Sequence, residues 1–197
     1  MSPLIATPEE VEPLPEEIIR QAELSPCGSL RFTLSRTWRA GPHVCFIGLN
    51  PSTADASKDD PTVRRWTHFA HAWGYGGFTA VNVFPVRSAK VADCRAWADW
   101  EKNGPDFWAR DRIHQNLGIV AREAKRAGLV VACWGAQTWA GDWIDQVIEE
   151  VQAGYEPWPD LYCFGLTKAG DPKHPMARGR DRIPNSAQPV IWKKSEA

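Results

Sequence analysis

A chain of 197 residues is long enough to bury a core, and at that length we expect one domain rather than several. A formal net charge of −1 excludes a strong polyelectrolyte binder whose whole surface is basic. No N-terminal run is apolar enough for a signal peptide and no run is long enough to cross a membrane, so we expect a cytoplasmic protein without a membrane partner.

The cysteines and the charges add two further constraints. Cys45, Cys133 and Cys163 each lie in an apolar, strand-like run, and no C-x-x-C pair occurs. This pattern indicates reduced thiols and argues against a disulfide framework or a cysteine zinc site. Residues 1–25 hold six Glu against one Arg, whereas seven Lys/Arg and three acids follow from Phe164 onward. That basic segment either meets phosphates or forms a solvated face.

The first elements are predicted from turn residues and periodicity. Residues 1–28 are rich in Glu and Pro and predict a flexible leader with a short helix near Glu16 to Ala22. Alternation from Leu30 to Leu34 predicts a half-buried strand, and the apolar run from Val44 to Leu49 predicts the first central strand. The later predicted elements are a helix from Pro61 to Trp73, a strand at 78–84, helices at 89–102 and 106–127, a strand at 129–134, a helix at 136–151, and strands at 161–166 and 190–192.

Apolar strands that alternate with helices predict a parallel sheet covered on both faces. We therefore expect a three-layer α/β/α sandwich with a central, mostly parallel four-stranded sheet. The expected organisation is a flexible leader over residues 1–28 and a single α/β domain over residues 29–197.

Polar residues follow each of the four predicted central strands. Because the carboxyl ends of parallel strands meet at one edge of a sheet, we expect these residues to converge on one crevice. In strand order they are Gly48, Leu49, Asn50, Pro51 and Ser52; then Asn82 and Arg87; then Trp134, Gly135, Ala136 and Gln137; and finally Thr167, Lys168, Lys173 and His174.

Three of these side chains also have a structural interpretation. Asn50 either braces the turn before a proline or serves a site. Asn82 at the end of an apolar strand is costly to bury without partners, which favours a site role. His174 is a lone histidine beside Pro175, and such histidines are often structural or exposed.

Charged residues that follow the first central strand leave alternatives open as well. Asp55, Asp59 and Asp60 are either loop and N-cap residues or ligands of a divalent cation. Arg64 and Arg65, on the first turn of the predicted helix, are either solvated or directed at a ligand.

Several strings resemble those of an uncharacterised bacterial and phage domain-of-unknown-function family, whose hallmark is the string LNPSTAD…DDPT-RR. The similarity runs from about Arg31 to Met176, with Met176 in a position where the family leads us to expect Leu. The strings are residues 31–34, 49–55, 59–65, 74–76, 82–84, 134–135 and 165–175.

The order of these motifs also resembles the uracil-DNA glycosylase superfamily, whose fold is the α/β/α sandwich expected above. Members have a Gly-x-Asn-Pro or Gly-x-Asp-Pro loop after the first core strand, an Asn at the end of the next strand, a Trp-Gly-type strand end and a late His-Pro-Ser loop. Here the corresponding segments are 48–51, Asn82, 134–136 and 174–175. Met176 replaces the serine, which weakens the last loop as a clamp on a DNA backbone.

The resemblance implies a role for each matching residue. Asn50 would position a water for attack on the anomeric carbon, and His174 would donate to the base carbonyl as charge grows on the leaving base. Asn82 would read the edge of a flipped base, with Trp66 or Phe84 stacked on it. Further substrate contacts are implied for Gly48, Leu49, Pro51, Ser52, Asp55, Arg64, Arg65, Trp134, Gly135, Thr167, Lys168 and Lys173, with Lys168, Lys173 and Arg178 meeting phosphates.

The function expected on this basis is hydrolysis of the N-glycosidic bond of a modified or deaminated base, in DNA or in a nucleotide. The expected protein is a monomer that needs no metal or other cofactor. One alternative is a metal-dependent hydrolase that uses Asp55, Asp59 and Asp60 with His174. The other is a nucleotide or nucleic-acid binder that lacks catalysis.

Overall fold

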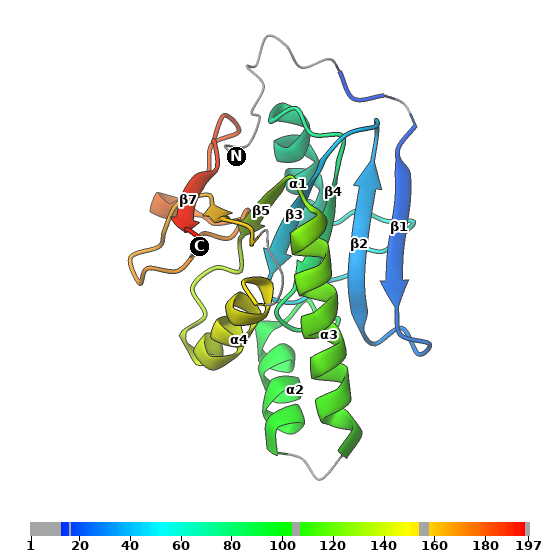
Figure 1. The fold of residues 1–197 in the computed structure, drawn as a ribbon, viewed down its shortest axis with the longest axis vertical. Helices are drawn as coiled ribbons and strands as arrows, with labels where there is room; N and C mark the ends of the chain where they lie inside the picture. Colours follow the sequence, from blue (N-terminus) through cyan, green and yellow to red (C-terminus); the bar gives the residue numbers. More distant parts are fainter. Residues whose placement is uncertain (1–12, 16, 104–106, 154–157, 196–197) are drawn as a thin grey trace.

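A computed structural model describes residues 13–15, 17–103, 107–153 and 158–195 of the chain. Within these residues, strands form a single mixed sheet in the order β1-β2-β4-β3-β5-β6-β7 (Figure 1). The elements are β1 (Ile19–Leu24), β2 (Arg31–Thr37), β3 (His43–Gly48), α1 (Pro61–Ala72), β4 (Gly77–Asn82), α2 (Val91–Asn103), α3 (Phe107–Arg126), β5 (Leu129–Ala132), α4 (Gly141–Val151), β6 (Leu161–Cys163) and β7 (Val190–Lys193), with short 3₁₀ turns at Thr138–Ala140 and Gly179–Asp181.

The four expected central strands are present as parallel neighbours. β3 pairs in parallel with β4 and with β5, and β5 pairs in parallel with β6. The sheet is nevertheless larger than the four strands expected, because β2 and β1 extend it antiparallel on one side and β7 on the other. The fold is therefore mixed α/β with a seven-stranded sheet.

The expected short helix near Glu16 to Ala22 is wrong. Residues Ile19–Leu24 form the edge strand β1, paired with β2 in a register that places Ile19 opposite Thr37. β1 is exposed along most of its length, so it lacks the apolar alternation by which a strand is recognised. Its conformation is decided by a partner strand, and part of the expected leader belongs to the sheet.

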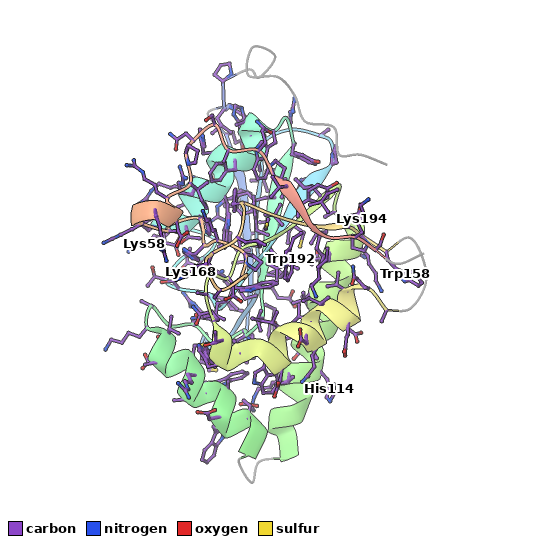
Figure 2. The ribbon with its side chains drawn as sticks, turned by 90° about the vertical axis from the view of Figure 1, so that its left-hand side faces the viewer. Lys58, His114, Trp158, Lys168, Trp192 and Lys194 are labelled. Carbon is purple, nitrogen blue, oxygen red and sulfur yellow. The ribbon has the colours of Figure 1, made fainter. Side chains whose placement is uncertain are left out.

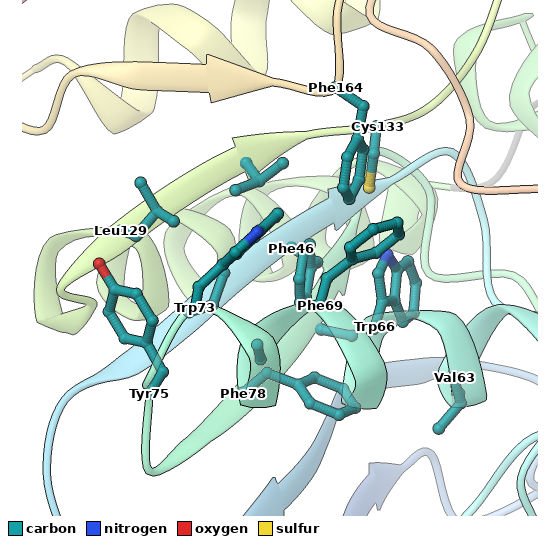
Figure 3. Close-up of a cluster of buried hydrophobic side chains, with 14 of the residues drawn as sticks. Phe46, Val63, Trp66, Phe69, Trp73, Tyr75, Phe78, Leu129, Cys133 and Phe164 are labelled. Atoms are coloured by element: carbon teal, nitrogen blue, oxygen red, sulfur yellow. The ribbon is translucent and has the colours of Figure 1, made fainter. Parts of the chain in front are cut away.

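Alternating side chains of the central strands divide the core between the two faces of the sheet. On β3, Val44 and Phe46 pack on one face with α1, whereas Cys45 and Ile47 pack on the other with α2, α3 and α4. Helices thus cover both faces. The α1 face is rich in aromatic side chains, among them Phe46, Trp66, Phe69, Trp73 and Phe164 (Figure 3).

Helix α1 begins where its sequence predicts. The Asp60 side chain accepts a hydrogen bond from the Val63 amide at 2.9 Å, and Pro61 occupies the first turn, where its missing N–H costs nothing. This cap fixes the start of α1 beside the carboxyl end of β3, where the candidate site lies.

No helix among the described residues is long and apolar enough to cross a membrane.

Candidate functional site

A cavity of about 440 Å³ opens at the carboxyl ends of the parallel strands. Segments far apart in the sequence form its walls: the start of β2, the loop after β3, the N-terminal half of α1 with its cap, the end of β4 with the segment up to the start of α2, the loop after β5, and the segment after β6. This is where ligands bind in open α/β sheets. The lining residues are Arg31, Gly48, Leu49, Asn50, Ser52, Asp60, Thr62, Trp66, Asn82, Ser88, Ala89, Val91, Trp134, Gly135, Ala136, Gln137 and His174.

The absence of a side chain at Gly48 makes room for Asn82. A Cβ placed on Gly48 would lie 2.8 Å from the Asn82 Oδ1, closer than real Cβ atoms approach. Asn82 is 1% exposed, and its Nδ2 has no hydrogen-bond partner among the described residues. A buried amide donor without a partner is costly in an unliganded protein. The cavity therefore offers this donor to a ligand.

The Asn50 side chain is fixed by backbone carbonyls. Its Nδ2 donates to the oxygens of Ser88 at 2.8 Å, Pro51 at 3.2 Å and Val86 at 3.4 Å. These contacts show that Asn50 braces the turn, one of its two expected roles. They also orient the amide, because the opposite end of the planar group must then be the Oδ1. Asn50 lines the cavity, and its Oδ1 accepts no hydrogen bond from the described part of the chain.

His174 is held in one tautomer. Its Nδ1 accepts a hydrogen bond from the Met176 amide at 3.1 Å, so in the neutral ring the proton resides on Nε2. Burial lowers the pKa of His174 below its ordinary value of 6.5, while the charge of Asp60 acts weakly in the opposite direction. The neutral ring therefore dominates at neutral pH and presents an Nε2–H donor.

Gly135 allows this histidine to approach. It has φ +79°, in the left-handed region that favours glycine, and a Cβ there would lie 3.2 Å from the His174 Cβ. The Gly135 amide also donates to the Pro172 oxygen at 3.0 Å, which ties the loop after β5 to the segment after β6.

Three further buried groups on the cavity wall have donors without partners. Arg31 and Trp134 are each 2% exposed and Trp66 is 4% exposed, and the Arg31 Nε, Trp134 Nε1 and Trp66 Nε1 have no hydrogen-bond partner among the described residues. Sequence reasoning assigned no role to Arg31. An arginine at the start of a strand carries no local signal of burial, because that burial depends on which distant segments cover it.

The three carboxylates considered as metal ligands are engaged with neighbouring protein groups. Asp55 Oδ1 accepts from the Ser57 hydroxyl and from the amides of Ser57 and Lys58, at 2.8 to 3.0 Å, and these hydrogen bonds, Ser57 foremost, lower its pKa. Asp60 Oδ1 caps α1. Nowhere among the described residues do three or more His, Cys, Asp or Glu side chains form a group that could hold a metal ion.

Asp59 belongs to an ion-pair network on the adjoining strands. Its Oδ1 accepts from Arg36 Nη2 at 2.7 Å and Nε at 2.9 Å, and its Oδ2 from Arg20 Nη1 at 2.6 Å. Burial alone would raise the pKa of Asp59, but the hydrogen bonds from both arginines outweigh it and the pKa lies below its ordinary value. The pairs join β1 and β2 to the loop before α1.

Ten of the residues expected after the strand ends line the cavity: Gly48, Leu49, Asn50, Ser52, Asn82, Trp134, Gly135, Ala136, Gln137 and His174. The two residues expected to stack on a base differ in their placement. Phe84 lies in the core, stacked on Trp139 with ring centroids 5.4 Å apart. Trp66, the alternative stacking residue, lines the cavity and is itself stacked on Phe46.

The remaining expected contacts lie around the cavity or farther away. Arg64 Nη1 donates to the backbone oxygen of Asp59. The Asp55 side chain accepts a hydrogen bond from the Lys58 amide, within the loop that both residues belong to. Arg65 contacts Ile183 and Asn185 and lines a second, more open hollow of about 800 Å³ formed mainly by residues 175–185. Pro51 is buried, with its oxygen bound by the Ser88 amide.

Three expected contacts lie on the segment after β6. Lys168 is exposed (Figure 2). Thr167 Oγ1 accepts from the Asp171 amide, and Lys173 Nζ pairs with Asp181 at 3.4 Å. None of the three lines the cavity.

The chain belongs to the family described as protein of unknown function (DUF1643), whose model matches residues 31–176. No curated protein gave a significant match. No solved structure gave a significant match either.

Proposed function

We propose that this protein is a glycosylase-like enzyme that hydrolyses the N-glycosidic bond of a modified or deaminated base, in DNA or in a nucleotide. The observation that carries the proposal is the convergence of Asn50, Asn82 and His174 on one cavity from three separate segments of the chain. Had these side chains faced different sides of the sheet, the proposal would have no basis.

The proposed chemistry assigns an acceptor to the water and donors to the base. Asn50 Oδ1 holds the attacking water, because its amide hydrogens are committed to backbone carbonyls. The water oxygen bonds to the anomeric carbon, the C–N bond breaks, and its electron pair leaves with the base. An amide does not deprotonate water in this pH range, so the proton is lost to solvent once the new bond forms. The contribution of Asn50 is therefore positioning.

Donors on the cavity wall match the charge that develops on the departing base. His174 Nε2–H and Asn82 Nδ2 are available as donors to its oxygen atoms, and a neutral imidazole suffices for this role. The cavity volume of about 440 Å³ falls within the range of small-molecule sites. The proposal places a single flipped base in this cavity, together with part of its sugar.

The experiment is incubation of the full chain with a panel of duplexes that carry modified pyrimidines and purines, followed by alkaline cleavage. Nucleotides are tested in parallel, with base release followed by chromatography. We expect cleavage of at least one substrate, and its loss in Asn50→Ala and His174→Ala. His114→Ala is the matched control, since His114 is an exposed histidine on α3 (Figure 2). Base release that persists in Asn50→Ala contradicts the proposed role of that residue.

A non-catalytic binder is the second candidate, and the bracing contacts of Asn50 favour it. An amide that only holds a loop needs no water. This candidate would be supported over hydrolysis if wild type and Asn50→Ala both bind a duplex or nucleotide of the panel and neither releases a base.

The metal-dependent alternative has less support, because Asp55, Asp59 and Asp60 each accept hydrogen bonds from neighbouring protein groups. Activity that disappears with a chelator and returns with Mg²⁺ would reverse this preference.

A further inference from the structure

Arg31 is a buried cation whose hydrogen-bonding capacity is largely unused. Its side chain is 2% exposed, and its Nη1 donates to the Ala54 oxygen at 2.9 Å. A guanidinium carries five N–H donors. The Nε has no hydrogen-bond partner, and no ion pair to Arg31 forms among the described residues. Burial lowers the pKa of this arginine to about 10, which reflects the cost of keeping it charged there.

A second arginine on the same strand shows what a structural role looks like. Arg36 is 1% exposed, and it donates to Asp59 through Nε and Nη2 and to the backbone oxygens of Asp55, Ser35 and Gln21. Its burial is compensated within the protein. Arg31 is almost equally buried, but the protein does not compensate its charge in the same way. Both residues lie on β2 and have carboxylates in their neighbourhood.

The surroundings of Arg31 favour a negatively charged ligand. Arg31 lines the cavity with Asn82 and Trp134, whose buried Nδ2 and Nε1 also lack hydrogen-bond partners within the described part of the chain. Asp60 lines the same cavity and offsets part of the positive charge, but its Oδ1 is committed to the cap of α1. A wall that combines a cation with several unpaired N–H donors is suited to oxygen acceptors that carry charge.

We propose that Arg31 is an anion-binding residue of this cavity and that its guanidinium takes an anionic oxygen of the ligand. This deepens the proposed function and rests on it for the kind of ligand. The anionic oxygen has two possible sources, which share one chemistry. It is either a phosphate oxygen of a nucleotide or a base oxygen that becomes negative as the base departs.

The test is isothermal titration of the full chain with three probes at neutral pH. Inorganic phosphate represents the first source. Barbiturate, a pyrimidine that is an anion at neutral pH, represents the second, and neutral uracil is its uncharged counterpart. The variants are Arg31→Met, which removes the charge, and Arg31→Lys, which keeps it without the planar fork. Arg122→Met on the exposed surface of α3 is the control for the change in net charge.

We expect phosphate or barbiturate to bind wild type and Arg122→Met alike, and to bind Arg31→Met about 10-fold or more weakly, since hydrogen bonds to charged groups have about this effect. Arg31→Lys should lie between them, and uracil should respond little to either change. Binding of phosphate identifies the first source and binding of barbiturate the second. If neither anion binds, or if each anion that binds wild type binds Arg31→Met equally well, the proposal is overturned.

Two further results keep the outcome decisive. Should Arg31→Met fail to fold, Arg31→Lys decides alone, with weaker anion binding in support and unchanged binding against. Anion binding that depends on Arg31 without base release from any substrate overturns the proposed function but leaves the assignment of Arg31 intact. Base release without anion binding that depends on Arg31 overturns the assignment of Arg31 and leaves the proposed function intact.

Discussion

Replacement of Gly48 by alanine tests whether the end of β3 is shaped to accommodate the Asn82 side chain. The added Cβ would lie 2.8 Å from the Asn82 Oδ1 but 3.7 Å from the nearest atoms of Trp66. The second distance is an ordinary contact, so the whole conflict falls on the Asn82 amide. That amide is buried on the cavity wall, so it can yield only toward the cavity, and such a shift costs the packing contacts that it makes now.

The expected loss of stability follows from two opposing effects. Overpacking of this kind costs about 1–3 kcal/mol. The lower conformational entropy of alanine in the unfolded chain offsets about 0.5–1 kcal/mol of that cost. The midpoints of these two ranges leave a net loss of about 1 kcal/mol in the free energy of unfolding for Gly48→Ala. This loss is measured by urea denaturation with tryptophan fluorescence.

Gly118 supplies the matched control. It lies within α3, and a Cβ there would meet nothing within 4 Å. Gly118→Ala should raise the free energy of unfolding by about 0.5–1 kcal/mol, the ordinary helical gain. In an Asn82→Ala background, Gly48→Ala should cost clearly less than in wild type. Equal stability of Gly48→Ala and wild type, or the same cost in both backgrounds, would refute the reasoning.

Three further predictions concern side chains whose contacts the structure defines. Arg36→Met should lower the free energy of unfolding by at least about 2 kcal/mol, because it removes a buried cation that is bound to Asp59; an unchanged denaturation midpoint would contradict this. Asn50→Asp should lower the free energy of unfolding by about 1–3 kcal/mol, because a carboxylate oxygen would replace the amide donor that faces the backbone oxygen of Ser88 2.8 Å away. A urea midpoint equal to that of wild type would count against the bracing role. Burial lowers the pKa of His174 in the folded protein, so as pH falls the unfolded chain binds the proton at a higher pH than the folded one. Wild type should therefore lose free energy of unfolding relative to His174→Gln as pH drops through 6.5. Parallel pH profiles of stability for the two proteins would exclude the assigned shift.

Much of the fold could be predicted from local patterns. The four parallel strands, α1 with its Asp60 cap and the terminal strand β7 all lie close to their predicted positions. Periodicity and capping depend on residues a few positions apart, which a single sequence displays directly. β1 was not predicted, because its conformation depends on pairing with β2 rather than on its own residues.

The candidate site was predictable only in part, for the same reason. Residues in turns at the ends of parallel strands were expected to converge, and Asn50, Asn82 and His174 do line one cavity. Phe84 is equally close to a strand end, but its side chain packs among aromatic residues of the α2 and α4 face. Position in the sequence locates a residue near the edge of a sheet, whereas the tertiary packing decides which way its side chain lies.

The sequence by itself determined the alternation of strands and helices, the start of α1 at Asp60 and the clustering of polar residues at strand ends. Only the tertiary structure decided the partners of charged and polar groups. Asp59 pairs with arginines from β1 and β2, whereas Arg31 is buried on a cavity wall with most of its donors unused. The physical reason is that burial and ion pairing depend on segments distant in the chain, and the free energy of a buried charge is fixed by whichever groups the fold brings to it.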